Sequence, residues 1–304
     1  MNAAPAVSVV VATHDRPKLL AQALAAIRAQ RYPGPIEVIA VFDRTEPDTS
    51  LESSDPTRTV RVVRNTRSPG LAGARNTGIG VATGEIVAFC DDDDMWLPGK
   101  LAEQVAVMRQ VDGAIACVCG IVIDYEGRRA VRVPRADELT TEQLLRRRVM
   151  AAHPSTLLVD RAALDRVGLV DEEIPGSYAE DYDWLLRIAA EGPVAVAELP
   201  LVRVRWGATS YFADRWALMA RAIEYLVEKH PEFRTCPRGL ARLWGRRSFA
   251  LAAAGEPDQA RALARETLIL NPFEARAYLA LAVSFGVVSP STVTGVLNRR
   301  GRGI

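Results

Sequence analysis

The most informative part of this 304-residue chain reads Ile86-Val-Ala-Phe-Cys-Asp91-Asp-Asp-Asp94-Met-Trp-Leu-Pro98-Gly-Lys100-Leu101. A short apolar run opens the stretch, as in a buried strand, and four consecutive aspartates follow it directly. Pro98 then stands where the first turn of a helix can begin, so the stretch predicts a strand, an acidic loop and a helix. Four adjacent carboxylates repel one another, and a divalent cation is the simplest group that offsets the repulsion.

The same order of strand, loop and helix recurs along the first half of the chain. We expect strands over residues 7–12, 36–42, 60–63, 86–90 and 114–123, and helices that begin at Pro17, cover residues 71–82 and run from Pro98 to residue 111. Strands that alternate with helices predict an α/β fold, Rossmann-like, with a mostly parallel central sheet flanked by helices. Ligands of such sheets bind beyond the carboxyl ends of the strands, and Thr13, Asp43 and Asp91 all stand at such ends.

The second half of the chain changes in character. A hairpin around residues 126–127, a charged helix over 137–148, a strand over 156–159, a helix over 178–191 and an extended segment over 193–205 complete the predicted α/β part. Everything after residue 211 is expected to be helical. We therefore predict a catalytic domain over residues 1–209 and an all-helical region over residues 210–304. In that region the spacing of Trp244, Gly255, Ala260 and Pro272 resembles a partial tetratricopeptide repeat, and an ordinary helical hairpin is the alternative.

The composition is that of an ordinary globular protein. Apolar residues make up 49%, charged residues 25% and the formal net charge is +1, which excludes disordered, collagen-like and nucleic-acid-coating proteins. The four cysteines lack the paired spacing of zinc or redox sites and the N-terminus lacks signal-peptide features, so a cytoplasmic location is expected. Residues 235–304 carry ten arginines against four acidic residues. A peripheral position at the inner membrane face is therefore an alternative to plain solvation of these charges.

Four motifs in a fixed order carry a family resemblance. They are residues 86–101 together with Val9-Val-Val-Ala-Thr13-His-Asp15-Arg-Pro17, Val41-Phe-Asp43 and Gly73-Ala-Arg75-Asn76-Thr-Gly78. With them, residues 7–205 resemble the family 2 glycosyltransferases of the GT-A fold. The resemblance implies an inverting enzyme that moves a sugar from a nucleotide diphosphate sugar to a hydroxyl acceptor by direct displacement.

The resemblance assigns the acidic loop to the donor diphosphate and its cation. Asp93 is implied as the direct ligand of Mn2+ or Mg2+, with Asp91 as a second ligand, and Asp91 or Asp92 lies near the ribose. A metal held by carboxylates can neutralise the charge that builds on the leaving diphosphate, which supports the same assignment physically. On a strand end, residues two apart point the same way, so Asp91 and Asp93 are expected to face one cleft.

The resemblance also assigns residues to the nucleotide. Asp43 matches the aspartate that reads the nucleobase, where its carboxylate can accept the imide N–H of uracil; UDP is thus favoured over dTDP and GDP as the donor nucleotide. Phe42 stands where many relatives have a second aspartate. Thr13 and Asp15 would line the same pocket, and Arg75 would reach the nucleotide. For Asp15 and Arg75, a helix cap or a surface ion pair is the alternative.

The acceptor side is implied by Tyr178-Ala-Glu180-Asp181-Tyr-Asp183-Trp184. By resemblance Asp181 is the base that takes the acceptor proton, with Glu180 beside it; acidic residues that stabilise a helix start are the alternative. His153 lies where relatives place acceptor-side residues. Trp206 stands where many relatives carry a metal-binding histidine, and it could instead stack on a sugar. The acceptor could be a glycan, a lipid-linked intermediate, a peptide or a natural product.

Two other functions compete with sugar transfer. A sugar nucleotidyltransferase also combines a doubly wound sheet with aspartates and magnesium, but it would show a Gly-rich basic loop after the first strand, where this chain has Thr13-His-Asp-Arg-Pro17. An inactive transferase-like scaffold with a partner-binding helical region is the non-enzymatic alternative, and the intact aspartates argue against it. A homodimer formed through the C-terminal helices is a further hypothesis.

Overall fold

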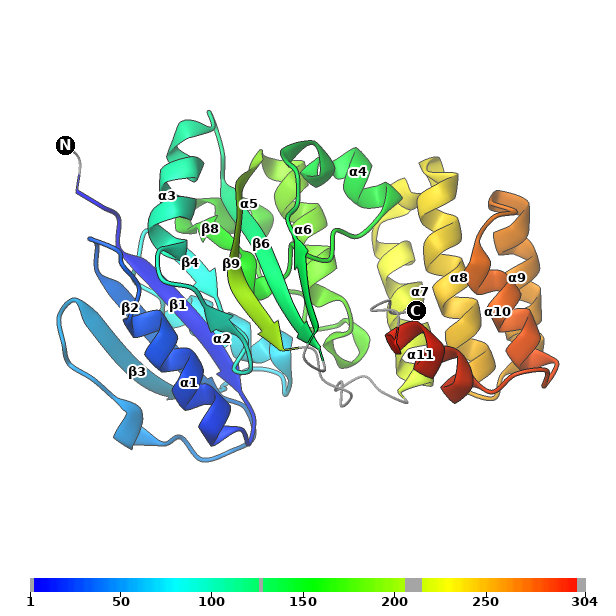
Figure 1. Ribbon diagram of the computed structural model, residues 1–304, viewed down its shortest axis with the longest axis horizontal. Helices are drawn as coiled ribbons and strands as arrows, with labels where there is room; N and C mark the ends of the chain where they lie inside the picture. The colour runs from blue at the N-terminus through cyan, green and yellow to red at the C-terminus, as the bar shows by residue number, and fades with distance from the viewer. Residues whose placement is uncertain (1–2, 126–127, 206–214, 300–304) are drawn as a thin grey trace. The chain divides into compact units, whose positions relative to one another are not determined.

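The computed structural model describes residues 3–125, 128–205 and 215–299 (Figure 1). The chain separates into two compact units. Unit 1 comprises residues 1–141, 149–172 and 180–206, and unit 2 comprises residues 142–148, 173–179 and 207–304. The predicted boundary between residues 209 and 210 lies outside the described residues and stays a prediction.

Unit 1 is built on one mixed sheet, for which the described residues supply nine strands in the order β3-β2-β1-β4-β8-β6-β9-β5, with β7 paired to β6. The strands are β1 Val7–Thr13, β2 Ile36–Phe42, β3 Arg58–Arg64, β4 Ile86–Phe89, β5 Met95–Trp96, β6 Ala116–Tyr125, β7 Arg128–Arg132, β8 Leu158–Asp160 and β9 Val194–Arg205. The helices of this unit are α1 Pro17–Arg28, α2 Leu71–Val81, α3 Lys100–Gln110, α5 Leu164–Val167 and α6 Glu180–Glu191.

The sheet confirms the predicted mostly parallel α/β fold. Strands β3, β2, β1 and β4 pair in parallel, and β6 and β9 run in the same direction because β8 pairs antiparallel with both β4 and β6. Within the described chain, six of the nine strands therefore share one direction, whereas β5, β7 and β8 oppose it. The parallel half delivers its four carboxyl ends to one edge, where the site lies.

Alternation along β1 explains how helices cover both faces of the sheet. Val7, Val9 and Val11 belong to the same core as the apolar faces of α1 and α3. Val10 points the other way, and α2 lies so close to it that a Cβ at Gly78 would come within 2.3 Å of a Val10 methyl group. A strand buried on both faces reads as a nearly continuous apolar run, which is why Ser8 is the one polar residue among residues 7–12.

Several predicted elements have different bounds in the structure. The helix expected from Pro98 begins at Lys100, because Gly99 precedes it with a φ of 112°. The predicted helix over 137–148 is instead a 3₁₀ turn, Ala136–Leu139, followed by α4, Thr141–Arg146. The predicted strand over 156–159 begins later, at Leu158, because Pro154–Thr156 forms a 3₁₀ turn. The strands on either side of residues 126–127 do pair as a hairpin.

Unit 2 is helical, as predicted, with α7 Trp216–Lys229, α8 Pro237–Ala253, α9 Pro257–Leu270, α10 Ala275–Ser284 and α11 Pro290–Arg299. Alanines at the contacts, including Ala250, Ala260 and Ala264, are buried and let the helices approach closely. Gly255 takes a φ of 85° in the turn between α8 and α9, where a side chain would be strained. The predicted helix pair around Trp244 and Ala260 is thus present. In the part of the chain that the structure describes, no helix has the length and apolarity needed to cross a membrane.

Candidate active site

Polar residues gather at the edge where the four parallel strands end. Asp43 follows β2, Asn65 follows β3 and Asp91 lies two residues beyond β4. Thr13 closes β1 and donates a hydrogen bond from its hydroxyl to Asp92 Oδ2 over 2.8 Å. Since 79 residues separate these two partners, the fold itself joins the first and fourth strand ends into one site.

The acidic loop is a turn rather than a strand extension. β4 ends at Phe89, and the backbone N–H of Asp94 donates to the carbonyl of Asp91 over 3.1 Å, which is the hydrogen bond of a four-residue turn. Asp91 and Asp93 are therefore not alternate residues of a strand, and the prediction that strand geometry turns them to the same side is wrong. Arg16 donates to Asp92 Oδ1 (3.1 Å) and to Asp93 Oδ2 (2.9 Å) and so offsets part of their repulsion.

Asp91 and Asp94 lie together with His153. One ligand atom from each of these three side chains lies within 4.8 Å of the others. Asp94 is buried, and this burial, with repulsion from Asp91 and Asp93, raises its pKa well above the ordinary value. Two carboxylates and an imidazole make a donor set that suits Mn2+, whereas Asp93 lies outside this group. The predicted role of Asp93 as a metal ligand stays a prediction.

Asp43 lies in a buried hydrogen-bonded position at the end of β2. Its Oδ1 accepts from Asn65 Nδ2 (2.9 Å), and its Oδ2 accepts from the backbone N–H of Gly70 (3.1 Å) and from Arg44 Nε (3.0 Å). Burial acts to raise the pKa of Asp43, but these hydrogen bonds outweigh it and the pKa is lowered. The carboxylate is therefore ionised at neutral pH and can only accept hydrogen bonds. His14 holds the same loop by donating from Nδ1 to the Asp43 carbonyl (2.7 Å).

Arg75 joins the acidic loop to the start of α6. It is 4% exposed, and its guanidinium donates to Asp91 Oδ1 over 2.8 Å and also to the carboxylate of Glu180. Burial acts to lower the pKa of Arg75, but Asp91 and Glu180 outweigh it and raise the pKa. Burial raises the pKa of Glu180 to about 7, although Arg75 opposes the shift. Arg75 thus forms buried ion pairs with two carboxylates, which excludes the alternative that it forms a surface ion pair.

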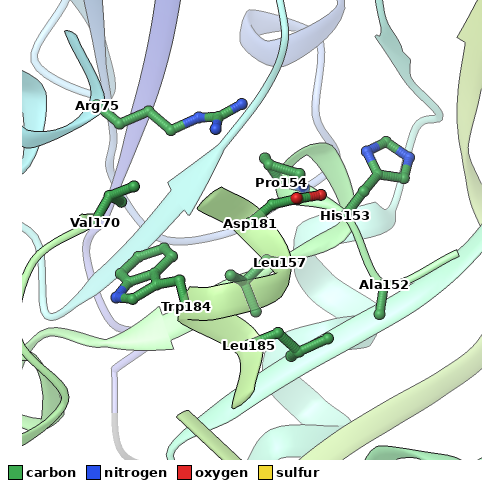
Figure 2. Close-up of a pocket in the computed structure, with 9 residues that line it drawn as sticks. All are labelled: Arg75, Ala152, His153, Pro154, Leu157, Val170, Asp181, Trp184 and Leu185. Carbon is green, nitrogen blue, oxygen red and sulfur yellow. The ribbon is translucent and has the colours of Figure 1, made fainter. Parts of the chain in front are cut away.

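A pocket opens beside this ion pair. Figure 2 shows the polar ends of Arg75, Asp181 and His153 in the upper half of the view, with the side chains of Leu157, Trp184 and Leu185 below them. Its lining is completed by Ala152, Pro154, Leu157, Val170, Trp184 and Leu185. The predicted base, Asp181, and the predicted acceptor-side residue, His153, therefore face one cavity, and the same Arg75 that lines it contacts the acidic loop.

The remaining predicted residues have mixed outcomes. Asp15 is exposed, adopts a φ of 53° and has no partner among the residues described, so neither the helix-cap nor the ion-pair alternative applies to it. Trp206 lies outside the described residues. Sequence reasoning gave no role to Asn65, Arg16 or Ser155, whose hydroxyl accepts from the backbone N–H of Asp91 (2.9 Å). Asn65 follows β3 directly, so the strand-end rule that selected Asp43 could have found it.

Residues 8–168, more than half of the chain, match the sequence pattern of the family described as glycosyl transferase family 2. The chain belongs to this family. An uncharacterized glycosyltransferase of Bacillus subtilis, YwdF, is 26% identical over 231 residues, which are 74% of this chain and 84% of that protein. The Escherichia coli UDP-Glc:alpha-D-GlcNAc-diphosphoundecaprenol beta-1,3-glucosyltransferase WfgD is 30% identical over 105 residues, 34% of this chain and 40% of that protein.

Solved structures confirm that this family 2 glycosyltransferase has the fold of other glycosyltransferases. S. aureus TarS, residues 1–349, in complex with UDP-GlcNAc matches with a TM-score of 0.61 at 18% identity, and the match covers 97% of this chain and 92% of that 1–349 fragment. The Pyrobaculum calidifontis mannosyltransferase PcManGT in complex with GDP-Man and Mn2+ matches with a TM-score of 0.58 at 22% identity, over 95% of this chain and 82% of that one.

Proposed function

We propose that this glycosyltransferase moves a sugar from a nucleotide diphosphate sugar to an acceptor hydroxyl in one inverting displacement, with Asp181 as the base. The observation that carries the proposal is the double contact of Arg75 with Asp91 and Glu180. This contact connects the acidic loop, where we place the sugar donor, directly to the helix that bears Asp181. Asp181 and Arg75 also line one pocket, as a base and a donor site must in a direct displacement.

In the proposed displacement, Asp181 accepts the proton that the acceptor hydroxyl loses. The acceptor oxygen attacks the anomeric carbon of the donor, its proton passes to the Asp181 carboxylate, and the bond from that carbon to the diphosphate oxygen breaks. Direct attack from the face opposite the leaving group inverts the configuration. Retention would need a different mechanism. Arg75 holds Glu180 and Asp91 in place through its contacts with both carboxylates.

A divalent cation fits the residues at the acidic loop. Asp91, Asp94 and His153 would hold it, because carboxylate oxygen and imidazole nitrogen are donors that Mn2+ accepts, and Mn2+ is bound in PcManGT. When bound, the cation neutralises charge on the leaving diphosphate. His153 would then supply the imidazole that Trp206 cannot.

The donor nucleotide and the acceptor follow from chemistry and from the relatives together. The ionised Asp43 favours a base that brings an N–H, as uracil, thymine and guanine do, and among these TarS, which is solved with UDP-GlcNAc, supports a UDP-sugar. WfgD uses a diphosphoundecaprenol-linked sugar as acceptor, and this supports a lipid-linked acceptor hydroxyl here. The excess of arginine over acidic residues in 235–304, ten against four, supports contact of this region with an anionic lipid surface.

The test compares two aspartate variants of the full chain. Asp181→Asn removes the base but keeps the shape of the side chain, and Asp112→Asn changes an exposed aspartate outside the site. Transfer from a panel of nucleotide sugars to a polyprenyl-diphosphate-linked sugar is followed by mass spectrometry, and UDP binding by calorimetry. Asp181→Asn should bind UDP like the wild type but transfer about 100-fold more slowly or worse, because a general base contributes at least that factor.

The proposal fails if Asp181→Asn transfers sugar as fast as Asp112→Asn does. It also fails if the wild-type chain binds no nucleoside diphosphate in the presence of Mn2+ or Mg2+, which would favour the inactive scaffold.

A further inference from the structure

Arg44 has an unusual backbone conformation directly after Asp43. Its φ is 55°, in the left-handed region that favours glycine. A non-glycine residue held there is strained, and such residues cluster at functional sites. Asp and Asn tolerate this region through short local hydrogen bonds, but arginine has no such compensation. The intrinsic backbone preference of arginine therefore does not explain the positive φ of Arg44.

The strained backbone places the guanidinium against the Asp43 carboxylate. Arg44 Nε donates to Asp43 Oδ2 over 3.0 Å, and the Arg44 side chain is half exposed. A guanidinium has five N–H donors, and among residues 3–125, 128–205 and 215–299 only this one contact uses them. The remaining donors of Arg44 are thus available to a ligand that reaches Asp43.

The Asp43 carboxylate has room for one more donor. A carboxylate offers about four lone-pair directions. Oδ2 accepts from Gly70 and Arg44, whereas Oδ1 accepts from Asn65 alone. A ligand that donates to Oδ1 would find the free Arg44 donors next to the same carboxylate. Asp43 and Arg44 together present an acceptor beside a donor.

On the basis of the proposed function, we infer that Arg44 reads the carbonyl beside the base N–H and so determines nucleobase specificity. Uracil, thymine and guanine each carry a ring N–H next to a carbonyl, so they match Asp43 as acceptor and Arg44 as donor. Adenine presents a ring acceptor next to an amine, and so does cytosine at N3 and N4, so both mismatch Asp43 and Arg44 when Arg44 donates to the carbonyl that corresponds to O4 of uracil or O6 of guanine. A site that hydrogen-bonds a ligand rejects analogues that leave its buried polar groups unpaired.

The test measures dissociation constants of UDP, dTDP, GDP, CDP and ADP for the full chain with Mn2+, by calorimetry. Arg44→Gly is the informative variant, because glycine adopts the positive φ without strain while the guanidinium is lost. UDP binding should weaken about tenfold, which corresponds to about 1.4 kcal/mol. The preference for UDP over CDP should fall by a similar factor, whereas the melting temperature should stay equal or rise.

Arg31→Ala is the matched control, since Arg31 is exposed and has no contact with Asp43 among the described residues. It should leave all five dissociation constants unchanged. Equal weakening of UDP and CDP by Arg44→Gly would overturn the inference, because Arg44 would then contact the diphosphate common to both. A UDP constant within twofold of the wild type would overturn it too. A wild-type chain that binds none of the five nucleotides would overturn the proposed function and this inference together.

Discussion

Replacing Arg75 by methionine should destabilise the protein strongly, and the loss should depend on pH. The guanidinium is buried and pairs with Asp91 and Glu180, whose side chains are 32% and 5% exposed. Water can solvate Asp91 when Arg75 is lost, but it cannot reach Glu180. Leaving one buried charge without its partner costs about 3–5 kcal/mol. Most of this loss should therefore come from Glu180.

The sign of the pH dependence follows from the pKa of Glu180. Its folded-state pKa is raised from 4.5 to about 7, so the folded chain binds more protons than the unfolded chain between these values, and stability falls as the pH rises through this window. Arg75 opposes the shift, so Arg75→Met should raise the pKa further. Above pH 7 the contribution of Glu180 levels off in the wild type, whereas the variant should keep losing about 1.4 kcal/mol per pH unit.

Urea denaturation at pH 6, 7 and 8, followed by circular dichroism, measures this effect. The double variant Arg75→Met/Glu180→Gln is the matched control, because it removes both partners and should recover most of the stability and lose the excess pH dependence. At pH 8, where Glu180 is mostly ionised in the wild type, a loss below about 1 kcal/mol for Arg75→Met, the size typical of an exposed pair, would refute the conclusion that the buried ion pair stabilises the fold. An identical pH profile in the single and double variants would refute the assignment to Glu180.

Two further predictions concern the helix beside the site and the cation. Gly73→Ala should destabilise the protein by at least about 2 kcal/mol, because its Cβ would lie 1.9 Å from the carbonyl oxygen of Ser68. In the same helix, a Cβ at Gly80 meets nothing within 4 Å, so Gly80→Ala should stabilise the protein by up to about 1 kcal/mol. Equal unfolding midpoints for the two variants would contradict the packing of α2. His153→Ala should weaken Mn2+ binding by about tenfold or more while Asp93→Asn changes it less, as measured by electron paramagnetic resonance; the opposite order would return the ligand role to Asp93.

Local pattern was enough to predict most elements of unit 1. The apolar runs of β1, β2 and β4 and the amphipathic face of α1 depend on residues close in sequence, so their strand or helix type could be read directly. Predictions were weaker where short polar segments adopt turns, as at Pro154–Thr156, because a 3₁₀ turn leaves no periodic signature. The acidic loop shows the same limit, because β4 ends at Phe89, one residue before the predicted end, and a turn then decides which aspartates lie together.

The sequence by itself determined the fold class, the strand-end position of Asp43 and Asp91, and the family resemblance. Only the tertiary structure decided which polar side chains meet. Arg75 and Glu180 are 105 residues apart, and Thr13 and Asp92 are 79 apart. Local periodicity determines which face of an element is buried, but the partner of a polar side chain depends on how distant elements pack and on the need to pair every buried charge. That need joins the acidic loop to α6 through Arg75.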